Sequence, residues 1–190
     1  LMQALKTALK SPYYKGTTVF GQYFTLEELI ATFLKELKKK ADLQMGENIT
    51  SVVCGRPVHF LNNADKDAQV QKRLEDGLRH AGFTDITFEF EPVAAAKQFI
   101  AQEEGLRLKE KTHVLVFDFG GGTLDTAIVK TGNGSSEVLA VDGVYIGGDL
   151  LNADIMKAKL WEYFGSKAFW GDYSMVMPTH IYESLQSWFS

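Results

Sequence analysis

The sequence of 190 residues contains a single cysteine, Cys54, which excludes an internal disulfide. Its longest purely apolar runs are a few residues long, far short of the about 20 that a membrane-spanning helix needs. No basic-then-apolar leader opens the chain, and its four histidines are scattered rather than placed at metal-ligand spacing. These absences predict a cytoplasmic protein with no membrane contact.

A basic surface is also missing. Lysine and arginine together number 20 and aspartate and glutamate 24, so the net charge of -4 offers no field for nucleic acid or an anionic membrane. Hydrophobic residues make up 45% of the chain, enough to bury the core of one or two small globular units. The first residue is Leu1 rather than methionine, which leaves open that the chain is a fragment.

Helices and single strands alternate in the first part of the chain. Thr25 stands three residues before Glu28, a capping box that predicts a helix ending near Lys40, with lysines 38 to 40 as its solvated end. A β-branched run at residues 50–54 predicts a buried strand with Cys54 in the core. A helix over residues 67–80, a strand over 86–90 and a helix opened by Glu91 and Pro92 follow.

From residue 113 the pattern changes to three successive strands. They are predicted at residues 113–118, 123–130 and 137–141, with a turn at 131–134, and a helix over residues 149–164 follows Gly147 and Gly148. Three meandering strands followed by alternating helices and strands are typical of a ribonuclease-H-like α/β lobe. The order here predicts the back half of one lobe, residues 1–111, followed by the front half of a second, residues 112–190.

A glycine-rich segment carries the strongest chemical signal. An apolar strand delivers Asp118 to its carboxyl end, and Thr123 and Asp125 follow the glycines. Glycines allow successive backbone N–H groups to point at one anion, and two carboxylates can flank a phosphate-bound Mg²⁺. The alternative is an ordinary glycine-rich hairpin with a capping aspartate. The glycines are Gly120, Gly121 and Gly122.

Two further segments are candidates. Glu91 lies between a strand end and a helix start, so it would enter the same crevice as Asp118 if the two strands belong to facing lobes. A carboxylate there can orient and deprotonate an attacking water, whereas its alternative role is helix capping. Gly147 and Gly148 precede a helix and are candidates for backbone contact with phosphate, with Asp149 as an ordinary N-cap.

Three motifs together resemble the seventy-kilodalton heat-shock (DnaK-like) chaperone family. Residues 117–125, Phe-Asp-Phe-Gly-Gly-Gly-Thr-Leu-Asp, resemble its second phosphate motif. Residues 91–96, Glu-Pro-Val-Ala-Ala-Ala, and 146–149, Ile-Gly-Gly-Asp, resemble two further family segments in the family's order. The sequence of residues 49–60 is most similar to the divergent YegD-type bacterial branch. The resemblance covers about residues 20–160.

The resemblance implies an actin-like ATPase fold that holds ATP or ADP between two lobes. It assigns Gly121, Gly122 and Thr123 to the β- and γ-phosphates, and Glu91 to the attacking water. It assigns Asp118 and Asp125 to hydrated Mg²⁺ or a monovalent ion such as K⁺. Pro57 matches the family's switch proline, whose basic partner is left open among Gln71, Lys72 and Arg73.

The chain also departs from the family pattern. The first phosphate loop, the lysine that meets the γ-phosphate and the adenosine motif are absent from it, so it is expected to hold half a site and to be inactive alone. His59 stands where the family has tyrosine. ATPase activity, unfolded polypeptide clients and co-chaperones are implied for an intact parent protein. Alternatives are a sugar or carboxylate kinase of the same fold, a filament-forming relative, and a non-catalytic interaction module.

Overall fold

The computed structural model describes residues 5–102, 112–132, 135–172 and 174–180. The chain divides into two compact units, Leu1–Leu108 and Lys109–Ser190, each described here by itself. None of the helices in the described ranges is long and apolar enough to cross a membrane.

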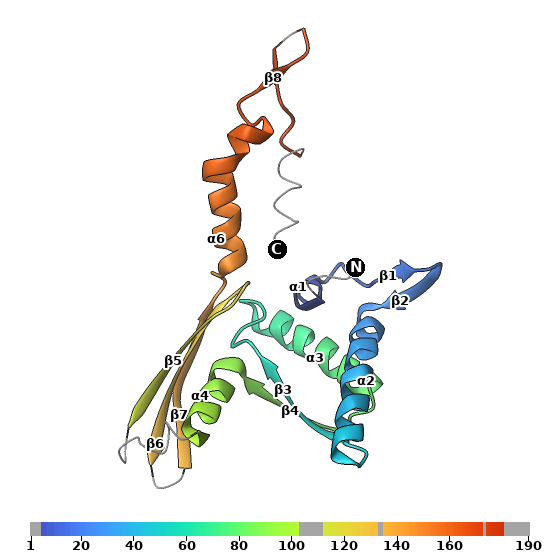
Figure 1. Cartoon of the computed structure of the whole chain (residues 1–190), viewed down its shortest axis with the longest axis vertical. Coiled ribbons are helices and arrows are strands. Elements are labelled where there is room, and N and C mark those ends of the chain that lie inside the picture. Colours follow the sequence, from blue (N-terminus) through green and yellow to red (C-terminus); the bar gives the residue numbers. More distant parts are fainter. Residues whose placement is uncertain (1–4, 103–111, 133–134, 173, 181–190) are drawn as a thin grey trace. The chain divides into compact units, whose positions relative to one another are not determined.

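The first unit is a helical layer with two small sheets (Figure 1). Strands β1 and β2 form an antiparallel hairpin, while β3 and β4 pair in parallel through the connecting helix α3. The sequence patterns missed α1 and the β1–β2 hairpin, and placed the other elements within a few residues. The elements are α1 Leu5–Lys10, β1 Gly16–Val19, β2 Gln22–Thr25, α2 Leu26–Met45, β3 Ser51–Arg56, α3 Ala64–His80, β4 Asp85–Phe90 and α4 Glu91–Ala101.

Helix α2 begins with the predicted capping box. The Glu28 N–H donates to Thr25 Oγ1 over 3.2 Å, and the Thr25 N–H donates to Glu28 Oε2 over 2.8 Å. The hydrogen bonds from the Thr25 backbone and side chain lower the pKa of Glu28, because they favour its charged carboxylate. The helix runs past the predicted end to Met45 and stops where Gly46 takes a left-handed φ of 74°.

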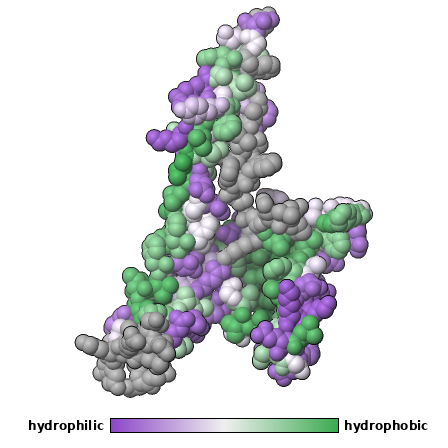
Figure 2. All heavy atoms as spheres, viewed as in Figure 1, coloured by the Kyte–Doolittle hydropathy of each residue, from purple (hydrophilic) through white to green (hydrophobic). Residues whose placement is uncertain are grey.

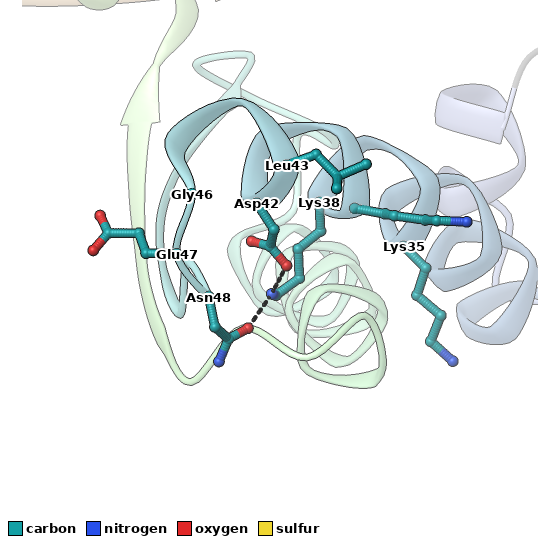
Figure 3. Close-up of a pocket in the computed structure, with 8 residues that line it drawn as sticks. Lys35, Lys38, Asp42, Leu43, Gly46, Glu47 and Asn48 are labelled. Atoms are coloured by element: carbon teal, nitrogen blue, oxygen red, sulfur yellow. Dashed lines mark hydrogen bonds and ion pairs between the residues drawn. The ribbon is translucent and has the colours of Figure 1, made fainter.

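Lys38 corrects the prediction of a solvated lysine run. Its side chain is buried, and its ammonium donates to Asp42 Oδ2 and to Asn48 Oδ1, each over 2.6 Å (Figure 3). The hydrogen bond from Lys38, followed by that from the Ile49 N–H, lowers the pKa of Asp42. These bonds clamp the last turn of α2 to the segment that leads into β3, which is why the helix does not end at the lysines.

Two apolar clusters form the core of the first unit. One joins α1, α2 and α3, and the other packs the end of α3 against β3 and β4. Cys54, predicted as a core residue, is half-buried against the second cluster. The buried members of the first are Leu9, Leu26, Ile30, Phe60 and Val70, and those of the second Leu78, Ala81 and Phe83.

The second unit opens with an antiparallel meander in the order β5-β6-β7 (Figure 1). All three of its strands are longer than predicted, and residues 133–134 of the expected turn lie outside the described residues. The predicted helix of residues 149–164 changes type twice along its length. The elements are β5 His113–Phe119, β6 Leu124–Gly132, β7 Ser135–Val144, α6 Gly148–Ile155, a π-helical turn Met156–Leu160, a 3₁₀ turn Trp161–Phe164, β8 Phe169–Trp170 and β9 Met175–Val176.

The buried face of the meander is formed mainly by β6, and the opposite face is exposed on β5. Asp125, Ala127 and Val129 alternate on the buried face of β6, each at most 2% exposed, as the sequence predicted. The outer face carries Leu115 and Phe117, which are 70% and 66% exposed, and hydrophobic residues are visible at the surface of the molecule in Figure 2.

Candidate functional site

The glycine turn joins β5 to β6 and brings two carboxylates together. The Gly120 N–H donates to the Thr123 carbonyl oxygen over 2.9 Å, which leaves Gly121 and Gly122 at the exposed tip. The strand register then pairs Asp118 directly with Asp125 across the ladder. Because direct cross-strand partners point to the same side of a sheet, both side chains lie on one face beside the turn.

This pair of carboxylates is suited to a hydrated cation. Asp125 is 2% exposed and Asp118 is half-buried. Like charges directly opposite each other in a sheet cost free energy, and burial adds a further cost, unless a counter-charge or hydrogen bonds offset them. The described residues contain no group of three or more potential metal ligands, so water would complete the shell, as Mg²⁺ prefers.

The start of α6 holds the glycine turn in place. The Gly148 N–H donates to the Gly120 carbonyl oxygen over 3.0 Å, and the Asp149 N–H donates to that of Gly121 over 2.8 Å. The helix cap is Gly147, so the alternative of Asp149 as N-cap is wrong. The amide of Gly148 therefore serves the turn itself, and direct contact of Gly147 and Gly148 with phosphate stays a prediction.

Close packing explains the glycine at position 147. A Cβ at Gly147 would lie 2.2 Å from the Gly121 carbonyl oxygen and 2.5 Å from its carbonyl carbon. None of Gly120, Gly121 and Gly122 has a φ in the left-handed range. The close approach of the two backbones therefore requires glycine at position 147, and the glycines of the turn do not adopt a left-handed conformation.

Glu91 is the first residue of α4, directly after β4. It lies at the carboxyl end of the parallel β3–β4 pair, where a Cβ on Gly55 would come 3.4 Å from Glu91 Cγ. The helix cap is Phe90, so Glu91 is not the capping residue, and Pro92 is second in the helix rather than first. Its predicted approach to Asp118 concerns two separate units and stays a prediction.

A buried arginine, Arg56, bonds to the backbone at the predicted switch proline. The sequence analysis did not single it out. Arg56 Nε donates to the Pro57 carbonyl oxygen over 3.0 Å, and Nη2 donates to that of Val58 over 3.3 Å. Nη2 also forms an ion pair of 2.6 Å with Asp67 Oδ2, and Nη1 donates to Gln71 Oε1. The sequence signal was an arginine that ends an otherwise β-branched strand next to proline.

Of the three partners left open for Pro57, Gln71 bonds to Arg56, which in turn bonds to the Pro57 carbonyl oxygen. Lys72 instead pairs with Asp76 over 2.8 Å, and Arg73 with Glu27 over 2.6 Å. The identity of the switch partner therefore stays a prediction, with Arg56 as the residue that bonds to the proline.

Asp67 completes the arrangement around Arg56. Its Oδ1 accepts the N–H groups of Phe60 and Leu61 over 2.5 and 3.1 Å. Burial by itself would raise the pKa of Asp67, but the hydrogen bond from Arg56 and those from Leu61 and Phe60 outweigh it and lower the pKa. The carboxylate is therefore charged at neutral pH and fixes the loop after Pro57.

Comparison with known proteins agrees with this architecture. The family model for Hsp70 protein matches residues 6–168, and the chain belongs to the Hsp70 family, whose fold is that of the actin-like ATPases. It is 36% identical over 132 residues to the chaperone protein DnaK of Prochlorococcus marinus (strain MIT 9515). That alignment covers 69% of this chain and 19% of the relative, so the chain spans about a fifth of it. Membership of the YegD-type branch stays a prediction.

Proposed function

We propose that this chain forms part of an ATP-binding and ATP-hydrolysing domain of an Hsp70-like chaperone. Hsp70 proteins bind ATP and ADP in general. The observation that supports the proposal for this chain is the pairing of Asp118 with Asp125 beside a turn of three glycines. A carboxylate pair next to exposed glycine backbone is suited to a phosphate group and its cation.

Each residue of the turn has a role in this proposal. Gly120, Gly121, Gly122 and Thr123 contact the β- and γ-phosphates, while Gly147 and Gly148 support the turn and add backbone contact. Asp118 and Asp125 hold hydrated Mg²⁺ or K⁺. The cation would neutralise phosphate charge, and the protein's own contribution is to position the phosphates and exclude other orientations.

Glu91 is the proposed residue for the attacking water. It stands at the carboxyl end of β4, and a carboxylate there can orient a water and accept its proton. Residues 1–111 would belong to lobe I and residues 112–190 to lobe II of the fold. The division of the chain between Leu108 and Lys109 supports this assignment.

The partners and the location are extended from the family. Unfolded polypeptides and co-chaperones would bind to a longer protein of the kind that the DnaK relative represents. This binding would take place in the cytoplasm. Membership in the Hsp70 family disfavours the kinase and filament alternatives.

Calorimetric titration of the 190-residue chain with Mg·ADP and Mg·ATP tests the site. We expect binding by the natural chain, loss of it in Asp118→Asn, and no change in Asp142→Asn, an exposed aspartate on β7 of the same sheet. Absence of heat from either nucleotide contradicts a working half-site here. Equal binding by both variants contradicts the assignment of Asp118.

The role of Glu91 is tested in the full-length natural protein that contains these residues. Replacement by Gln keeps the shape and removes the proton acceptor. We expect Glu91→Gln to leave nucleotide affinity nearly unchanged and to slow single-turnover hydrolysis by about 10²-fold or more, the scale of a lost general base. Glu137→Gln, on exposed β7, is the control, and an unchanged rate in Glu91→Gln removes this residue from the mechanism.

A further inference from the structure

Arg56 is a buried cation that the proposed function does not yet use. It is 9% exposed, at the end of β3. Its guanidinium bonds to the carbonyls of Pro57 and Val58 and to the side chains of Asp67 and Gln71. A charge taken out of water is costly unless it is paired and hydrogen-bonded, and here two side chains and two carbonyls supply that compensation.

The same guanidinium also touches the strand that leads to Glu91. Arg56 is the register partner of Phe90 in the parallel β3–β4 pair. Its guanidinium carbon lies 5.6 Å from the centre of the Phe90 ring and 4.8 Å from that of Phe60. Contacts of this kind between a desolvated guanidinium and aromatic rings are attractive and directional.

Glu91 also lies beside the backbone next to Arg56. A Cβ added at Gly55 would lie 3.4 Å from Glu91 Cγ, so the Glu91 side chain lies beside the end of β3. Glu91 follows Phe90 without an intervening residue. A displacement of Arg56 would therefore disturb the Phe90 ring and the end of β3, which both lie next to Glu91.

We propose that Arg56 is a positioning residue for Glu91, which joins the segment after Pro57 to the carboxylate that orients the attacking water. In this role Arg56 acts on Glu91 through Phe90 and the end of β3. The inference rests on the proposed function, since it presumes hydrolysis that depends on Glu91. The fork of donors on Arg56 is what this role requires, and lysine, with one compact ammonium, cannot reproduce it.

The test is a double-mutant cycle in the longest natural chain that carries these residues. Arg56→Lys should slow single-turnover hydrolysis by about 10- to 100-fold, the scale of a misplaced catalytic group, with the Kd for ATP changed by less than about threefold. In the Glu91→Gln background the same substitution should have no further effect, because it acts through Glu91. Arg79→Lys, which breaks exposed bonds to Glu75 on α3, should leave the rate unchanged in both backgrounds.

The outcomes separate the two proposals. An unchanged rate in Glu91→Gln removes Glu91 from the proposed mechanism, and the positioning role of Arg56 falls with it. A normal effect of Glu91→Gln with no effect of Arg56→Lys, or with an equal effect of Arg56→Lys in both backgrounds, overturns only the positioning role. Phe90→Leu removes the ring but leaves the polar bonds of Arg56. It should also slow hydrolysis, and this effect should disappear in the Glu91→Gln background. Phe90→Leu replaces Arg56→Lys in the test if the Arg56→Lys variant does not fold.

Discussion

Asp67 links the chemistry of single residues to the stability of the first unit. It binds Arg56 through one oxygen and the N–H groups of Phe60 and Leu61 through the other. The bonded carboxylate is favoured in the folded protein, so its pKa is lowered relative to the unfolded chain. A group with a lowered native pKa stabilises the fold above its unfolded pKa and loses that effect as pH falls through the native pKa.

A pH series of urea unfolding tests this sign. We expect Asp67→Asn to lower the free energy of unfolding at pH 7 by about 1–3 kcal/mol, the range for a hydrogen bond to a charged group. The difference should shrink as pH falls below about 4, the ordinary pKa of aspartate, because the natural chain then loses its charge. Asp65→Asn, exposed in the same turn of α3, is the control. A difference that stays constant down to acid pH would contradict the assignment.

The carboxylate pair of the candidate site was within reach of the sequence, whereas the arrangement at Arg56 was not. Asp118 and Asp125 flank one short turn, so the tight hairpin that places Phe119 opposite Leu124 also pairs these two carboxylates. Asp67 and Gln71 bond to Arg56 although they lie 11 and 15 positions away from it in the sequence. Such contacts depend on how α3 packs beside β3, which local patterns do not encode.

At the scale of elements, the contact between α6 and the glycine turn decides the geometry of the site. A Cβ at Gly147 would meet Gly121 backbone at 2.2 Å, while one at Gly148 would meet the Gly120 carbonyl oxygen at 3.8 Å, an ordinary contact. The two neighbouring glycines therefore differ in whether a side chain fits at their position, although both belong to one motif.

We expect Gly147→Ala to weaken nucleotide binding and to destabilise the second unit by about 1–3 kcal/mol, the usual cost of overpacking. Gly148→Ala should leave both properties near those of the natural chain, because its Cβ has room. Calorimetric titration and thermal unfolding of the two variants give the comparison. Equal losses in both variants would mean that close packing is not the reason for glycine at position 147.

Elements with a local chemical signature were predicted well and the others were missed. The capping box at Thr25 and the apolar periodicity that follows it specify α2 without help from the rest of the chain. The β1–β2 hairpin turns at Phe20 and Gly21, with φ of 48° and 82°, instead of the asparagine–glycine pair that marks such turns. The helix after Gly147 becomes π-helical at Met156, which its sequence periodicity does not reveal.

On the scale of the whole molecule, the two units differ in how much apolar surface they bury. The first has two clusters built from large side chains of its helices and strands. In the second, the buried apolar residues among those described are Ala127, Val129 and Met156, while Leu115 and Phe117 are exposed. Since apolar burial is the main source of stability, the first unit has the greater capacity to fold alone.

We therefore expect residues 1–108 to unfold cooperatively when expressed alone. Residues 109–190 should bind a hydrophobic dye and lack a sharp transition, because their sheet leaves one face uncovered. Circular dichroism during heating, together with dye fluorescence, measures both properties. A sharp transition without dye binding in residues 109–190 would contradict this expectation.

The reactivity of Cys54 can report on local opening of the first unit. It is the single cysteine of the chain, half-buried on β3 two residues before Arg56 and beside the cluster around Leu78. A thiol reagent modifies a half-buried cysteine faster when the structure around it opens locally. The rate of labelling by such a reagent therefore reports how often the end of β3 separates from its neighbours, and no engineered probe is needed. A nucleotide that stabilises this region would slow the labelling.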